Sequence, residues 1–138
     1  MITALEVPGW EAVRASHSRT AVDLRLRRNG VTVEVRLERC VSGRLRDTYP
    51  VGAHDVEVRI GAGCPEPMRP ALLRALSDAV QEADSRCRRV VVVPAGAPAG
   101  VEVAESAGFR YAVDVDPGEE ELSLLVTEPD WVTSADNA

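Results

Sequence analysis

The sequence predicts an α/β domain with a mixed, mostly antiparallel sheet and one long and one short helix in its C-terminal half. Two alternating apolar runs flank Asn29-Gly30, an apolar stripe repeats at helical spacing over Pro65–Ala83, and a β-branched run follows at Val90–Val93. Strands and helices in this order are typical of the α/β class. The 138 residues suffice for one domain, which we expect over residues 1–133, with a loose tail at 134–138.

At the front of the chain, Ile2–Val7 is predicted as a strand. Pro8–Arg19 is predicted as one short helix, with Trp10 and Val13 turned toward the core.

Asn29-Gly30 is the clearest local signal, because Asn-Gly tolerates positive φ at both central positions of a two-residue hairpin turn. Such a turn fixes the register, so the numbers of facing residues add up to 59 (29 + 30). Apolar pairs then share one face and opposite charges share the other. The facing pairs are Val22–Leu37, Leu24–Val35 and Leu26–Val33 on the apolar face, with Asp23–Arg36 and Arg25–Glu34 on the polar face.

Asp55–Ile60 alternates as a third strand, and Gly61–Gly63 ends it. Pro65–Ala83 is predicted as the long helix, and Val90–Val93 as a strand covered on both faces. We expect one core to include Met68, Leu72, Leu76, Val56, Val58, Val91 and Val93.

The remaining elements follow in short succession. Pro98–Ala107 is predicted as the second helix, ended by Gly108. Arg110–Asp116 and Glu121–Thr127 are predicted as two strands joined at Pro117-Gly118.

Composition and charge exclude several classes of function. No run approaches a membrane-spanning length and no signal peptide is evident, so we expect a cytoplasmic protein that does not bind membranes. A net charge of −6 and 4% aromatic residues argue against nucleic-acid binding. All 16 basic residues are arginine, a bias typical of GC-rich genomes such as those of actinobacteria, and this rules out lysine Schiff-base chemistry.

The distribution of charge is uneven. Residues 1–46 hold nine arginines and five acidic residues, whereas residues 47–138 hold seven and seventeen. A solvated acidic end explains this best, and an Arg-rich half that faces an anionic partner is the alternative.

The cysteines and histidines do not form a metal site in the sequence. Cys40, Cys64 and Cys87 are odd in number and widely spaced, which predicts free thiols. His17 and His54 stand alone, as solvated residues do, and no metal is expected.

The order from Val22 onward resembles the GNAT superfamily of acyl-CoA-dependent N-acyltransferases. The segments that carry the resemblance are VEVRI, PALLRALSDAV, RRVVVV, VEVAESAGF and ELSLLV. It implies a GNAT-like fold whose strand, helix, strand and helix from Val56 onward form the half that binds acetyl-CoA or another acyl-CoA. It also implies two helices after the first strand that wall the acceptor site; here about a dozen residues, Pro8–Arg19, are available, so that part is truncated.

The phosphate-binding motif departs from the family pattern. Where the family places Arg or Gln, then Gly, then Gly or Ala before the long helix, this chain has Cys64, Pro67 and Arg69. Prolines remove amide donors and Glu66 adds a negative charge, whereas Arg69 could bind a phosphate through its side chain. The resemblance therefore gives Ile60, Gly61 and Arg69 as candidate cofactor-binding residues.

The catalytic positions depart as well. The family's thiolate-protonating tyrosine aligns with Ala104, and Tyr111 lies beyond the helix, where a core-edge aromatic is the simpler interpretation. Glu57 is the candidate general base, and a polar residue on the outward face is the alternative.

Two hypotheses of different classes follow. The favoured one is a GNAT-like domain with a degenerate cofactor motif that works as a non-catalytic ligand-binding or partner module. The alternative is an active acyl-CoA-dependent N-acyltransferase that binds its cofactor in a divergent way and acts on an unidentified small-molecule acceptor. Because the front helices are short, we also expect a homodimer or a protein partner.

Overall fold

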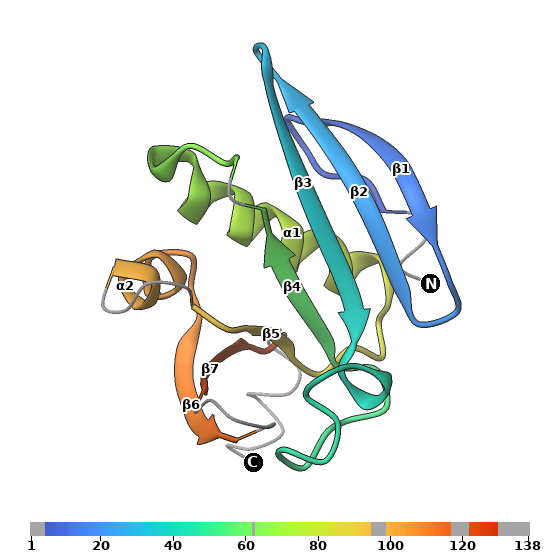
Figure 1. Cartoon of the computed structure of the whole chain (residues 1–138), viewed down its shortest axis with the longest axis vertical. Helices are drawn as coiled ribbons and strands as arrows, with labels where there is room; N and C mark the ends of the chain where they lie inside the picture. The colour runs from blue at the N-terminus through green and yellow to red at the C-terminus, as the bar shows by residue number, and fades with distance from the viewer. Residues whose placement is uncertain (1–4, 62, 95–98, 117–121, 130–138) are drawn as a thin grey trace.

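Seven strands form one sheet in the computed structural model, which describes residues 5–61, 63–94, 99–116 and 122–129 (Figure 1). The strands are β1 (Glu11–His17), β2 (Ala21–Arg28), β3 (Val31–Arg39), β4 (Val56–Ile60), β5 (Val90–Val92), β6 (Arg110–Val115) and β7 (Leu122–Thr127). Their order across the sheet is β1-β2-β3-β4-β5-β7-β6. β4 and β5 are parallel, and the other neighbouring pairs are antiparallel, as the sequence predicted for a mixed sheet.

The long helix α1 (Arg69–Ala83) connects β4 to β5 and crosses one face of the sheet behind β2, β3 and β4 (Figure 1). A single 3₁₀ turn, η3 (Glu66–Met68), precedes it, and another, η2 (Cys40–Ser42), follows β3. The short helix α2 (Ala99–Ser106) ends before Gly108, whose φ of +94° suits glycine. Both predicted helices are confirmed, although α1 begins at Arg69 and not at Pro65 as predicted. No described helix is long and apolar enough to cross a membrane.

The predicted hairpin is confirmed pair by pair. Val22 faces Leu37, Leu24 faces Val35 and Leu26 faces Val33, with all six side chains buried. Asn29 and Gly30 both have positive φ, as a two-residue turn of this kind requires. The polar face carries the Arg25–Glu34 ion pair at 3.3 Å.

The front of the chain corrects the prediction. Residues 11–17 of the expected helix Pro8–Arg19 form the strand β1, which satisfies the outer backbone groups of β2 and includes a register shift between Arg14 and Ser16. Val13 is 49% exposed rather than turned inward, whereas Trp10 packs against the core. Of the predicted strand Ile2–Val7, residues 2–4 lie outside the described residues and the remainder is not a strand, although Leu5 and Val7 are buried.

The apolar residues form two clusters, because successive residues of a strand point to opposite faces of the sheet. The cluster under α1 contains Leu72, Leu76, Val56 and Val58, with Met68 packed against it, as predicted. Val91 belongs instead to a second cluster on the other face, and Val93 packs against that one. The prediction of one core for all seven residues is therefore wrong for these two valines.

The connection between β3 and β4, residues 40–55, covers the second cluster. Leu45 of this loop is fully buried there, with Tyr49 and Val51 packed around it. Asp84, just after α1, connects the end of this helix to the β3–β4 region. Arg39 Nη2 donates to Asp84 Oδ2 at 2.6 Å, and His54 Nδ1 lies 3.0 Å from the same oxygen.

Candidate functional site

A groove opens where β4 and β5 separate. The two parallel strands pair only at Val56–Val90 and Glu57–Val91, and beyond these pairs they diverge. The space between them has a volume of about 670 Å³ and continues between the start of α1 and α2. Its lining residues come from β4 (Val58, Arg59, Ile60), the turn into α1 (Cys64, Glu66, Arg69, Leu73), the end of β5 (Val92, Val93, Pro94) and α2 (Gly100, Val103, Ala104).

The turn that leads into α1 offers few amide donors to an anion in this groove. Three of the six residues in Pro65–Pro70 are prolines, which have no N–H. The Met68 amide donates to the Pro65 carbonyl at 3.0 Å, and the Arg69 amide donates to the Glu66 carbonyl. Within this segment only the amide of Glu66 is left, beside that residue's own carboxylate, so the backbone is poorly suited to hold a diphosphate.

Arg69 brings a positive charge to the same end of the groove. Its Nη2 lies 3.4 Å from the carbonyl oxygen of Gly61, a long contact that ties the side chain weakly. Ile60 lines the groove with it. The structure thus brings the three candidate cofactor-binding residues to one place, and their binding of a cofactor stays a prediction.

The cysteines are free thiols, as predicted, and none has the environment of a reactive one. Cys64 lines the groove, where burial raises the pKa of its thiol and the charge of Arg69 only partly opposes this. Burial raises the pKa of Cys40 and of Cys87 to about 12. Among the described residues, no three His, Cys, Asp or Glu side chains gather as metal ligands.

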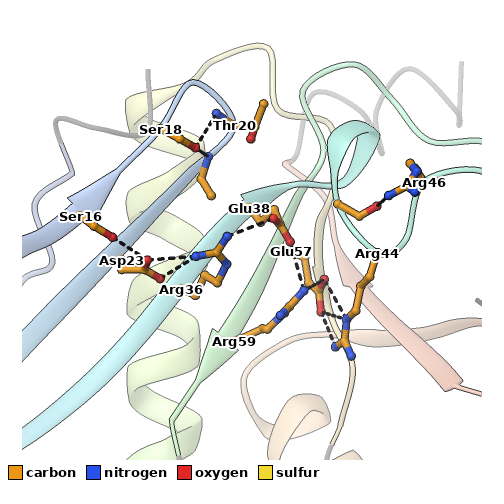
Figure 2. Close-up of polar contacts among 12 residues, drawn as sticks. Ser16, Ser18, Thr20, Asp23, Arg36, Glu38, Arg44, Arg46, Glu57 and Arg59 are labelled. Atoms are coloured by element: carbon orange, nitrogen blue, oxygen red, sulfur yellow. Dashed lines mark hydrogen bonds and ion pairs between the residues drawn. The ribbon is translucent and has the colours of Figure 1, made fainter.

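Neither predicted catalytic candidate faces the groove. Ala104 lines it from α2 and supplies no hydroxyl. Tyr111 lies on β6, is 54% exposed and is not among the residues that line the groove. Glu57 does not line it either, because it alternates with Val56 and Val58 and points to the face of the sheet turned away from α1 (Figure 2).

Glu57 is buried, with 2% of its side chain exposed, and not an outward polar residue as the alternative interpretation expected. Arg44, from the β3–β4 loop, donates to Glu57 Oε2 at 2.6 Å, and Arg59 Nη2 donates to Oε1 at 3.3 Å. Both carboxylate oxygens therefore already accept hydrogen bonds from arginine, an arrangement that suits a structural ion pair better than a general base.

These contacts belong to a longer network that the sequence prediction missed (Figure 2). In the β3–β4 register, Arg36 faces Arg59 and Glu38 faces Glu57, so like charges sit directly opposite each other. Glu38 offsets both arginines: its Oε1 accepts from Arg59 at 3.1 Å and its Oε2 from Arg36 at 3.3 Å. Alternating charges on three neighbouring strands could have indicated the network, but the register of β4 and the position of Arg44 depend on the loop.

Comparison with solved structures identifies the architecture. Aminoglycoside acetyltransferase AAC(6')-Ib in complex with coenzyme A superposes with a TM-score of 0.65 at 14% identity, over 86% of this chain and 72% of that one. The GNAT domain of S. lividans PAT gives 0.58 at 21% identity, over 83% and 65%. This chain has the GNAT fold.

Further neighbours agree with this assignment. A SpeG spermidine N-acetyltransferase chimera from Vibrio cholerae and hSSAT gives a TM-score of 0.60 at 10% identity, over 85% of this chain and 72% of that one. No protein-family model and no curated protein matches the sequence. The GNAT fold confirms the resemblance drawn from the pattern of strands and helices, and at these identities it establishes architecture alone.

The front of this GNAT fold is shorter than the family pattern implies. Only the turn Ser18–Thr20 connects β1 to β2. In this turn Ser18 Oγ accepts a hydrogen bond from the backbone amide of Ala21 at 3.1 Å. No helix lies between β1 and β2, a stretch that the structure describes throughout. The β3–β4 loop instead covers the face of β5 and β7 that is turned away from α1.

Proposed function

We propose that this chain is a non-catalytic GNAT-fold module that binds a ligand or a protein partner. The observation that carries the proposal is the loss of donors at the turn into α1, where three prolines and two internally bonded amides leave only the Glu66 amide in residues 65–70. Each missing N–H to a charged oxygen is worth on the order of 1.5–3 kcal/mol. Loss of two would remove most of a diphosphate's affinity.

The groups around the groove support the same proposal. By the family resemblance, Ala104 takes the position of the tyrosine that protonates the departing thiolate, and it lines the groove without a hydroxyl. The carboxylate of Glu57 is held by Arg44 and Arg59 on the other face of the sheet. A general acid or base must reach the proton that it transfers, and neither position offers one to a molecule in the groove.

An active acyltransferase is the second candidate function. Arg69 and the end of β4 line the same groove, and coenzyme A is bound in structures of AAC(6')-Ib that share the fold. In that case Arg69 would hold the diphosphate by a bidentate contact from its side chain in place of the backbone amides. A homodimer or protein partner and a cytoplasmic location stay predictions.

A thiol-release assay with acetyl-CoA tests the absence of catalysis. We expect no acceptor-dependent release of coenzyme A with spermidine, an aminoglycoside or a lysine peptide, since Ala104 supplies no hydroxyl to the groove and the Glu57 carboxylate lies on the other face of the sheet. AAC(6')-Ib with its aminoglycoside serves as the positive control. Acceptor-dependent release that disappears in Arg69→Ala would instead establish the acyltransferase.

A further inference from the structure

Arg44 is the one residue of the β3–β4 loop whose side chain reaches Glu57 in the described structure (Figure 2). Its Nη2 lies 2.6 Å from Glu57 Oε2, and its Nε lies 3.2 Å from Oε2 and 3.3 Å from Oε1. Two neighbouring nitrogens of the planar guanidinium thus engage one carboxylate, which is the arrangement that distinguishes guanidinium from ammonium recognition.

The two partners differ in burial. The Glu57 side chain is 2% exposed and belongs to the sheet, whereas the Arg44 side chain is 41% exposed and belongs to a loop. Arg59 also contacts Glu57, but it is shared with Glu38 and its contact is longer, at 3.3 Å. Without Arg44, only the shared Arg59 would balance the negative charge of the buried Glu57 carboxylate, and an unbalanced buried charge destabilises the fold.

The loop is seated closely beside this site. Gly43 packs against Glu38 so tightly that a Cβ there would lie 2.8 Å from Glu38 Oε1. Leu45, on the other side of Arg44, is fully buried in the second cluster. Glu57 itself lies at the last β4–β5 pair, directly where the groove begins on the opposite face.

We propose that Glu57 is the centre of a guanidinium-binding site on the face of the sheet turned away from α1, and that Arg44 occupies it from within the chain. The contact is autoinhibitory: the loop keeps the site closed to any other alkylguanidine, such as the end of an arginine or agmatine-like ligand. The inference does not depend on what the groove binds, and it is tested without acetyl-CoA, so the two proposals can fail separately.

Chemical rescue with methylguanidinium tests the site. We expect Arg44→Ala to lower the melting temperature. Methylguanidinium at about ten times its Kd should raise the melting temperature of Arg44→Ala by about 5 °C more than it raises that of wild type. The rescue should be absent in the double variant Arg44→Ala/Glu57→Gln, which lacks the charge that the probe would bind. Arg25→Ala is the matched control, because its partner Glu34 is well exposed and forms no buried site.

A second variant covers the case in which Arg44→Ala does not fold. Arg44→Gln keeps a polar but shorter and uncharged side chain, and the backbone amide signals of Glu57 and Arg59 in ¹H–¹⁵N spectra then report binding of the probe directly. Saturable shifts at these two residues, absent in wild type, are the expected result. Equal responses of the Arg44 variants, wild type and the double variant would overturn the proposal.

Discussion

Leu72→Ala is expected to lower the free energy of unfolding by about 2–5 kcal/mol. Leu72 is 1% exposed on the face of α1 that packs on the sheet, within the cluster that also holds Val58 and Leu76. Truncation removes buried apolar atoms and leaves a cavity that a closely packed cluster closes only in part. Urea denaturation monitored by circular dichroism measures the change.

A control on the same helix separates burial from helix propensity. Asp78→Ala, at an exposed position of α1, should change the free energy of unfolding by less than about 0.5 kcal/mol. A loss below about 0.5 kcal/mol for Leu72→Ala would contradict the assignment of the buried face of α1.

Acid is expected to remove about 2 kcal/mol of stability through Asp84. Burial by itself raises the pKa of Asp84, but hydrogen bonds from the Arg86 amide, from Arg39 and from His54 outweigh it and bring the pKa from 3.8 to about 2. Because the folded pKa is the lower one, this stability is fully present above pH 4 to 5. It disappears as the pH falls from there through about 2.

Comparison of wild type with Asp84→Asn across pH isolates this contribution. At pH 7 the variant should be less stable by about 2 kcal/mol, and the difference should shrink toward zero near pH 2. Asp78→Asn, an exposed carboxylate on α1, is the control. A difference between wild type and Asp84→Asn that stays constant from pH 7 to pH 2.5 would show that the ion pairs of Asp84 do not lower its pKa.

Local rules predicted the parts of the fold in which neighbours in sequence determine the structure. The two-residue turn at Asn29-Gly30 fixes the register of β2 and β3, so every facing pair could be derived. The stripe on α1 likewise specifies its buried face, and Gly108 specifies the end of α2. The family resemblance drawn from this order of elements agrees with the GNAT fold.

Tertiary contacts determined the parts that were predicted wrongly. Residues 11–17 form a strand because β2 offers an edge to pair with, although Trp10 and Val13 also suit a helical face. The fold places Val91 on the side of the sheet away from α1, where the β3–β4 loop buries it. Because that loop has no periodic pattern, neither its coverage of β5 nor the approach of Arg44 to Glu57 could be predicted from the sequence.

Calorimetric titration of the purified chain with acetyl-CoA tests most directly whether the turn into α1 lacks affinity for this cofactor. The titration compares wild type, Arg69→Ala and Arg74→Ala, which changes a matched arginine outside the groove. For all three we predict a dissociation constant above about 100 µM, which is a binding free energy weaker than about −5.5 kcal/mol. Micromolar binding by wild type and Arg74→Ala that collapses in Arg69→Ala would contradict the non-catalytic proposal and place Arg69 on the diphosphate.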